Sequence, residues 1–248
     1  MFRLLYCLYQ LVVVLPVLFV TTLLTSVSTS LGCMFGDATF WSYWPGRLWS
    51  ASLCRLLWLP VHVEGREHLQ SGQSYVFVSN HQGAFDIFLV YGFLHRPFKW
   101  MLKQSLRRVP MVGIACEKAG FTFVDKSSPR AVAKTMIQAR ESLRDGSSMV
   151  IFPEGSRTYT GQVGEFKRGA FQLATQFRLP ICPLTIDGSF EVLPRQRGFG
   201  FVTRHALRLV IHEPITDIGK SSEAIGQAMQ QCRDTIVSAL PPQHQDPA

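Results

Sequence analysis

The sequence predicts an α/β protein with a largely parallel central sheet flanked by helices, preceded by N-terminal membrane-embedded helices. Three features predict this class. After about residue 64, short apolar runs rich in β-branched residues alternate with segments of helical periodicity. Most of these runs are apolar throughout, as expected for strands that are covered on both faces of a parallel sheet. Before that point, the chain carries a long uncharged stretch.

This N-terminal stretch, residues 4–32, has no charged side chain. As a helix at ~1.5 Å per residue it would be about 43 Å long, which exceeds the hydrocarbon core of about 30 Å. A secretory signal is one alternative because Arg3 precedes the run, although signal h-regions usually have about 7 to 15 residues. A lipoprotein cleavage site at Cys33 is another, but Ser30 stands where an aliphatic residue is expected. We therefore predict a retained anchor.

A second apolar stretch, residues 40–63, is interrupted by prolines and arginines and contains Trp41, Trp44, Trp49 and Trp58. Tryptophan concentrates at membrane interfaces, where its ring is buried and its N–H stays hydrated. We predict an interfacial helix or a shallow return; the alternative is a tryptophan-rich helix packed on the soluble domain. Residues 1–63 are therefore assigned to a membrane anchor and interfacial region, and residues 64–240 to a catalytic domain.

The strands expected in the catalytic domain are residues 75–79, 121–124, 149–152, 181–186 and 207–211. The best defined helix is 129–144, where Ser128 is a suitable N-cap, Pro129 takes the first helical position and Gly146 follows the end. A last helix over 222–240 is stopped by two prolines, and residues 241–248 are predicted to form a flexible tail.

The chain is basic, with a net charge of +8 and a pI near 9.4. Such a charge suits nucleic acid, anionic lipid or phosphorylated substrates. The basic residues are dispersed and no interleaved aromatic RNA-binding motif occurs, which argues against nucleic acid. The six cysteines are scattered without a CxxC pair, so neither a metal site nor a disulfide framework is indicated.

The segment Asn80-His-Gln-Gly-Ala-Phe-Asp86 follows the first expected strand of the catalytic domain. Positions five apart lie about 140° apart on a regular helix, so His81 and Asp86 can meet only if His81 precedes the helix and Asp86 lies in its first turn. Asp86 would then accept the Nδ1 proton of His81 and leave Nε2 to take a proton from a substrate hydroxyl. The alternative is a purely structural histidine. Backbone N–H groups near His81 are candidate oxyanion donors.

The second motif, Phe152-Pro-Glu-Gly-Ser-Arg-Thr158, also follows an expected strand. Ligand crevices of open α/β sheets lie at the carboxyl ends of the strands. Arg157 offers a planar fork for a phosphate, and Glu154 is expected to orient that arginine or to bind a substrate hydroxyl. The alternative is an ordinary turn with a surface arginine.

These two motifs, NHxxxxD and FPEGSRT about 70 residues further on, resemble those of the glycerolipid acyltransferase family, most closely its 1-acyl-sn-glycerol-3-phosphate acyltransferases. The resemblance covers residues from about 60 to 215. It implies that His81 is the general base on the hydroxyl of a lysophospholipid, that Asp86 orients it, and that Glu154, Gly155 and Arg157 belong to the acceptor site. It also implies direct acyl transfer from acyl-CoA or acyl carrier protein, without a required metal or other cofactor.

Two lysines are further candidates for the acceptor phosphate. Lys103 matches a family position, and Lys126 stands where the family's motif commonly ends in arginine. A lysine binds phosphate as a point charge, without the bidentate fork of arginine. The near-helical spacing of Lys99, Lys103, Arg107 and Arg108 predicts that they share one helix face, where the others attract anionic lipid.

The expected reaction is acylation of the sn-2 hydroxyl of lysophosphatidate to phosphatidate at a membrane. An acyltransferase for glycerol 3-phosphate, another lysophospholipid or a lyso-ornithine lipid is the nearest alternative, and a non-catalytic membrane lipid-binding protein is the alternative from another class. Arg47, Arg55 and Arg66 follow the uncharged stretch 4–32, so the positive-inside tendency favours a catalytic domain that faces the cytoplasm.

Overall fold

A computed structural model describes residues 2–125, 127–144, 147–198 and 200–245. Within them lies one sheet with the strand order β1-β7-β6-β2-β5-β3-β4. Its strands are β1 Val61–Glu64, β2 Val76–Ser79, β3 Phe98–Lys103, β4 Thr122–Val124, β5 Ser148–Ile151, β6 Ile181–Asp187 and β7 Leu207–Ile211. Neighbouring strands are parallel except for the antiparallel pair β6–β7. The expected largely parallel α/β architecture is confirmed.

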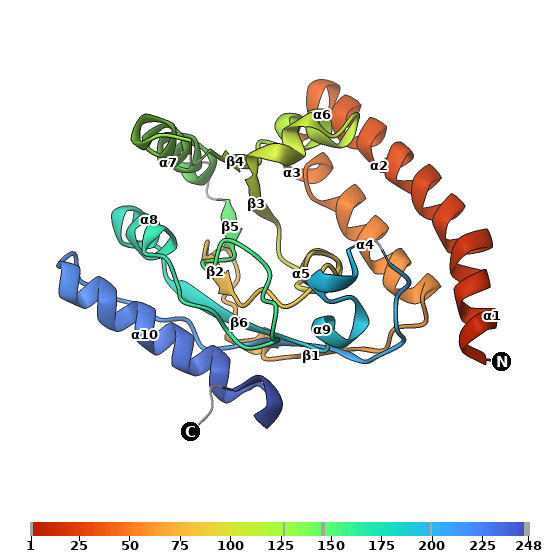
Figure 1. Cartoon of the computed structure of the whole chain (residues 1–248). Helices are drawn as coiled ribbons and strands as arrows, with labels where there is room; N and C mark the ends of the chain where they lie inside the picture. Colours follow the sequence, from red (N-terminus) through yellow and green to blue (C-terminus); the bar gives the residue numbers. More distant parts are fainter. Residues whose placement is uncertain (1, 126, 145–146, 199, 246–248) are drawn as a thin grey trace.

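Helices cover both faces of this sheet (Figure 1). They are α1 Phe2–Tyr9, α2 Leu15–Phe35, α3 Ala38–Trp41, α4 Trp44–Leu56, α5 Asp86–Phe93, α6 Val112–Lys118, α7 Pro129–Arg144, α8 Gly169–Phe177, α9 Ser189–Val192 and α10 Ser222–Ser238. The segment Gln10–Val14, which is π-helical, joins α1 to α2 without a break. Single 3₁₀ turns occupy Arg66–His68, Gln104–Arg108, Arg195–Arg197 and Pro242–His244.

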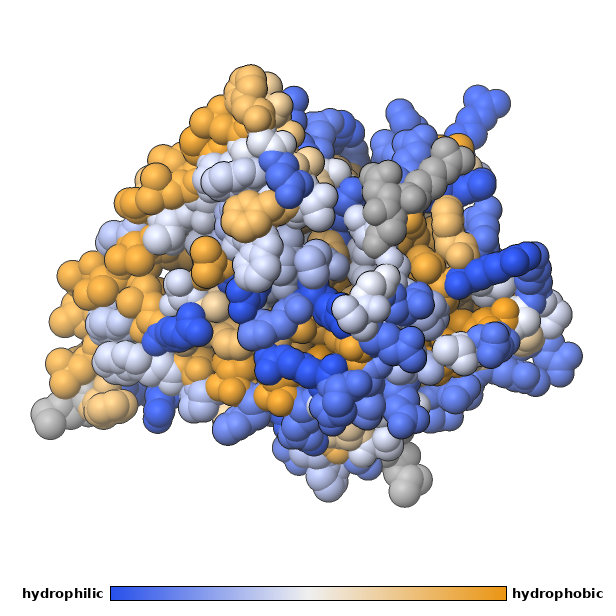
Figure 2. Space-filling view, turned by 180° about the vertical axis from the view of Figure 1, so that it is seen from behind, coloured by the Kyte–Doolittle hydropathy of each residue, from blue (hydrophilic) through white to orange (hydrophobic). Residues whose placement is uncertain are grey.

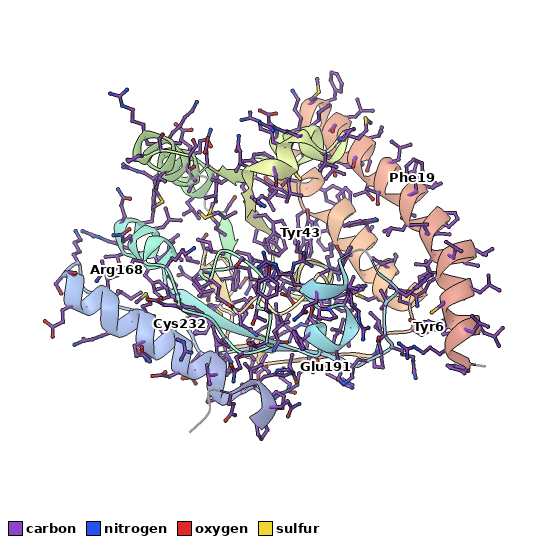
Figure 3. All side chains as sticks on the ribbon, in the orientation of Figure 1. Tyr6, Phe19, Tyr43, Arg168, Glu191 and Cys232 are labelled. Carbon is purple, nitrogen blue, oxygen red and sulfur yellow. The ribbon has the colours of Figure 1, made fainter. Side chains whose placement is uncertain are left out.

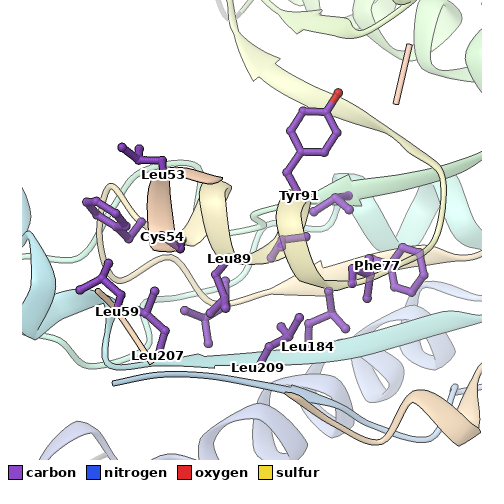
Figure 4. Close-up of a cluster of buried hydrophobic side chains, with 14 of the residues drawn as sticks. Leu53, Cys54, Leu59, Phe77, Leu89, Tyr91, Leu184, Leu207 and Leu209 are labelled. Atoms are coloured by element: carbon purple, nitrogen blue, oxygen red, sulfur yellow. The ribbon is translucent and has the colours of Figure 1, made fainter. Parts of the chain in front are cut away.

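Alternate strand residues divide the interior into two cores. Phe77 and Leu184 point to the face covered by α4 and α5, where they pack with Leu53 and Leu89 (Figure 4). Their neighbours along the strands point to the face covered by α7, α8 and α10, as Val78 does. Both faces are apolar because the sheet is buried on both sides, which explains strand runs without polar alternation.

The five expected strands and the helix 129–144 are all present. Strands β1 and β3 were not expected. In the region of β3, the prediction that four basic residues share one helix face is wrong. Lys99 and Lys103 lie in β3, while Arg107 and Arg108 lie in the 3₁₀ turn that follows it, so these four residues do not share a helix face. Residues four positions apart lie on the same face of a strand as well as of a helix. The spacing of these charges therefore did not distinguish a strand from a helix.

The N-terminal helix Phe2–Phe35 is long and apolar enough to cross a membrane, and only 11% of its most apolar window is buried. Its outward side chains, Phe19 among them, form an apolar band along one flank of the molecule (Figure 2). Its other side contacts the domain: Tyr6 and Tyr9 donate hydroxyl hydrogen bonds to the carbonyls of Leu57 and Leu56, at 2.8 and 2.9 Å. The predicted boundary between residues 63 and 64 falls inside strand β1, so the anchor region continues directly into the sheet.

The C-terminal segment is packed as far as the structure describes it. The last helix ends at Ser238, and the 3₁₀ turn Pro242–His244 places the His244 side chain in a buried position. This part of the predicted flexible tail therefore lies against the domain. Residues 246–248 of that tail lie outside the described residues.

Candidate active site

Three neighbouring strands end at the same edge of the sheet. Strand β2 pairs in parallel with β5 on one side and with β6 on the other. The loops that follow β2 and β5 carry the two sequence motifs, so His81 and Glu154 meet there. This is the edge at which parallel α/β sheets bind their ligands.

His81 and Asp86 form the expected pair. Asp86 is the first residue of α5, and its Oδ2 lies 2.5 Å from Nδ1 of His81 and accepts the main-chain N–H of Gly83 at 3.0 Å. The Asp86 side chain is fully buried, whereas that of His81 is 16% exposed. Because the carboxylate can only accept, Nδ1 carries the proton and Nε2 is left with the free lone pair.

The ring of Phe152 holds the imidazole from one side. The two rings are stacked, with centroids 4.1 Å apart and planes at 13°. Phe152 in turn stacks on Trp100, with centroids 5.9 Å apart. The orientation of the His81 imidazole is thus fixed by a hydrogen bond at Nδ1 and by stacking on the ring of Phe152.

Glu154 ties the second motif to the first. Its Oε1 accepts the main-chain N–H of His81 at 2.8 Å and its Oε2 accepts that of Gly164 at 2.9 Å. Burial raises the pKa of Glu154 to about 7, against the lowering effect of the N–H groups of Gly164 and His81. Both carboxylate oxygens accept main-chain N–H groups, so Glu154 braces the His81 loop, and among the described residues no hydrogen bond joins it to Arg157.

Further buried contacts fix the same loop, and the sequence analysis missed them. Asn80 donates to the carbonyl of Ile186 and accepts its N–H, both at 2.8 Å, which fastens the loop to β6. The N–H of Thr158 donates to the carbonyl of His81 at 2.9 Å. A Cβ at Gly83 would lie 2.4 Å from the carbonyl oxygen of Ser189, so only glycine fits there. Asn80 is the first residue of the NHxxxxD motif, and its place there was the available indication.

Arg157 lies beside this cluster with its guanidinium half-buried. It lines a depression of about 700 Å³ together with three more cationic side chains, namely Lys167, Arg168 and Arg195. Arg195 donates to the carbonyl of Arg157 at 2.9 Å and lies over the ring of Tyr159, 4.2 Å from its centroid. Gly155 makes the turn before Arg157 possible with a φ of +75°. No sequence motif had indicated Arg195.

The remaining expected site residues differ in placement. Lys103 is exposed at the carboxyl end of β3, one strand beyond β5 at the same edge of the sheet. Lys126 lies outside the described residues. The main-chain N–H groups of His81, Gly83 and Ala84 already donate to Glu154, Asp86 and Leu193, so these groups are not free to act as oxyanion donors.

The fold and this cluster define an α/β protein in which a histidine–carboxylate pair and a cationic depression lie together at the carboxyl edge of a parallel sheet. A model of the Acyltransferase family matches residues 60–187, which contain both motifs. The chain belongs to the Acyltransferase family.

Individual relatives agree with this assignment. The chain is 32% identical over 170 residues to a chloroplastic 1-acyl-sn-glycerol-3-phosphate acyltransferase of Arabidopsis thaliana, covering 68% of this chain and 47% of that protein. It is 30% identical over 190 residues to the 1-acyl-sn-glycerol-3-phosphate acyltransferase of Borreliella burgdorferi, covering 74% of each. The chain spans about half the length of the plant relatives that it matches.

The fold also has a counterpart of known structure. The crystal structure of the 1-acyl-sn-glycerophosphate (LPA) acyltransferase PlsC from Thermotoga maritima superimposes with a TM-score of 0.77 at 24% identity. The match covers 95% of both chains, so it includes the N-terminal helices as well as the sheet.

Proposed function

We propose that this protein transfers a fatty acyl group from an acyl thioester to the sn-2 hydroxyl of lysophosphatidate and so makes phosphatidate. The observation that carries the proposal is the His81–Asp86 pair, in which Nδ1 of His81 is engaged at 2.5 Å. Glu154, which accepts the main-chain N–H of His81, lines the same depression as Arg157. The relatives named above support lysophosphatidate as the acceptor.

In the proposed mechanism, Nε2 of His81 takes the proton of the acceptor hydroxyl as its oxygen attacks the thioester carbonyl carbon. The C–S bond then breaks, and the leaving thiolate receives the proton from His81. Asp86 stabilises the imidazolium that forms between these two steps. The reaction requires the two substrates and the residues of this chain, and the donor is acyl-CoA or acyl carrier protein.

Arg157, Gly155 and Glu154 are proposed for the acceptor side of the site, with Lys103 and Lys126 as further phosphate partners. An arginine fork matches the oxygens of a phosphate monoester. The half-buried position of Arg157 at the rim of the depression supports this role. Glu154 contributes by bracing the His81 loop through its two main-chain contacts.

We propose that the N-terminal helices hold the protein at a membrane, with the catalytic domain on the cytoplasmic side. The exposed apolar side chains of α1 and α2 support membrane contact (Figure 2). Hydrogen bonds from Tyr6, Tyr9 and Gln10 to the domain favour helices that lie along it within one leaflet. In Figure 3, Tyr6 lies on the domain side of α1 and Phe19 on the outer side of α2.

The test is purified full-length protein in vesicles, assayed with labelled acyl-CoA and acyl carrier protein against a panel of acceptors. The panel contains lysophosphatidate, glycerol 3-phosphate, a lysophospholipid with a larger headgroup and a lyso-ornithine lipid. We expect the highest kcat/KM with lysophosphatidate, and a kcat lower by about 10² to 10⁴ in His81→Ala. Transfer to another acceptor instead would correct the substrate, and lipid binding without any transfer would overturn the enzymatic proposal.

Arg157→Lys tests the acceptor side. The lysine keeps the charge and loses the fork, so KM for lysophosphatidate should rise while kcat changes little. An unchanged KM for every phosphate-bearing acceptor would remove Arg157 from the phosphate site.

A further inference from the structure

The C-terminal turn Pro242–His244 brings a buried histidine close to the candidate site. His244 is only 4% exposed, and its Nε2 lies 2.7 Å from Oε1 of Glu191 in α9. Glu191 is labelled in Figure 3. Because a carboxylate can only accept, Nε2 carries the proton. The ring of Phe190 meets the imidazole edge-on, with centroids 5.6 Å apart. His244 is thus held by a charge partner and an aromatic neighbour.

The imidazole of His244 contacts the main chain of Gly161. This residue has a φ of +89°, and a Cβ built on it would lie 2.4 Å from Nδ1 of His244. Only glycine gives the loop both that backbone conformation and that approach. Beside this contact, the side chain of Gln162 donates to the carbonyl of Gln245 at 3.4 Å. The turn therefore closes over loop 158–164.

The other side of loop 158–164 contacts the proposed base. The N–H of Thr158 donates to the carbonyl of His81 at 2.9 Å, and the carbonyl of Gly161 accepts from the buried side chain of Gln82 at 3.2 Å. At its end, the N–H of Gly164 donates to Glu154, which also holds the N–H of His81. The loop thus lies between His244 and the His81 segment, in contact with both.

We propose that His244, held by Glu191, is a positioning residue that keeps loop 158–164 seated against His81. The proposal rests on the acyl transfer proposed above and extends it to a residue outside both motifs. Removing the imidazole opens a space behind Gly161, and the loop then relaxes away from Gln82 and from the carbonyl of His81. The base is displaced, whereas the four cationic side chains of the depression, Arg157, Lys167, Arg168 and Arg195, lie outside this loop, so the effect falls mainly on the chemical step.

Three substitutions separate the hydrogen bond from packing. His244→Ala removes both, His244→Phe fills the space without a donor to Glu191, and His244→Gln retains an amide donor. We expect kcat to fall about tenfold or more in His244→Ala and His244→Phe, with KM for lysophosphatidate within about twofold of the wild type. His244→Gln should recover most of kcat, and added imidazole should rescue His244→Ala but not His244→Phe. His205→Ala, at an exposed histidine bonded only to its neighbour's carbonyl within the described residues, is the matched control.

Hydrogen exchange supplies a readout that does not depend on turnover. The amides of Thr158 and Gly164 should exchange about tenfold faster in His244→Ala and His244→Phe than in the wild type. Unchanged exchange, or a loss of kcat that follows loss of thermal stability without rescue by imidazole or glutamine, would overturn the positioning role. If the wild type shows no acyl transfer, the proposed function fails. Amide exchange in loop 158–164 then still tests whether His244 holds this loop against the His81 segment.

Discussion

Phe152, the first residue of one motif, stacks on the imidazole of His81, the second residue of the other. The rings are nearly parallel, and Trp100 supports Phe152 from beyond. Two segments that are far apart in sequence are therefore joined by stacking as well as by the hydrogen bonds of Glu154. The imidazole of His81 is held in a fixed orientation by these contacts.

Phe152→Ala should lower kcat about tenfold while leaving KM for the acceptor nearly unchanged. Stacked pairs contribute roughly 0.5 to 1.5 kcal/mol, and a tenfold change in rate corresponds to about 1.4 kcal/mol. Phe152→Leu, which keeps much of the volume, should lose less. Steady-state kinetics on vesicle-bound protein give the comparison. Equal kcat in the alanine variant and the wild type would show that stacking of Phe152 on His81 does not contribute to turnover.

Substituting the proposed base and its partner should reduce turnover without releasing the protein from the membrane. His81→Ala should cost about 10² to 10⁴ in kcat, the usual contribution of a positioned general base. Asp86→Asn keeps the buried volume and removes the charge that stabilises the imidazolium, so we expect a loss of on the order of 10²-fold. Vesicle flotation serves as the control for membrane binding. Near-normal turnover of His81→Ala would exclude the proposed base.

Glu154 should make the stability of the protein depend on pH in a defined window. Its pKa is raised from 4.5 to about 7 in the folded state, so between these values the folded protein binds more protons than the unfolded chain. The free energy of unfolding should therefore fall as pH rises from about 4.5 through about 7, by on the order of 3 kcal/mol.

Glu154→Gln cannot titrate and should lack this part of the pH dependence. Unfolding in detergent at pH 4.5 and pH 7.5, compared between wild type and variant, isolates the contribution because the other groups titrate in both proteins. Identical pH dependence in the two proteins would contradict a raised pKa of Glu154.

Gln10 should couple the N-terminal helix to the domain. Its side chain is buried, donates to the carbonyl of Val202 at 2.9 Å and accepts its N–H at 2.7 Å. Gln10→Leu leaves both main-chain groups without a partner, at a cost of roughly 1 to 3 kcal/mol. We expect a lower Tm in detergent and faster amide exchange at Val202. Leu8→Ala, at an exposed position of the same helix, should change neither.

The parts of the fold that were predictable are those with local causes. Helix α7 begins with Pro129 and follows a cap that Ser128 supplies, and both are visible in the sequence. The His81–Asp86 contact was predictable because the five-residue spacing permits one arrangement. Strand β3 was missed because Lys99 and Lys103 have a spacing that also suits a helix.

The contacts that complete the site join residues far apart in the chain, and no local pattern indicates them. The pair Asn80–Ile186 spans 106 positions, and each partner alone is unremarkable in sequence. The same holds for His244 and Glu191, which are 53 positions apart. In these cases the parallel pairing of β2 with β6, and the return of the chain after α10, create the contact.

The hydroxyl groups of Tyr6 and Tyr9 donate hydrogen bonds to main-chain carbonyls at the end of α4. They fasten the N-terminal helix to α4, which covers one face of the sheet. The N-terminal helix and the sheet that carries His81 are therefore held together through α4. Under the proposed acyl transfer, a lipid whose hydroxyl lies at another depth in its leaflet would have to move to reach His81, so the proposed site would select acceptors by depth as well as by charge.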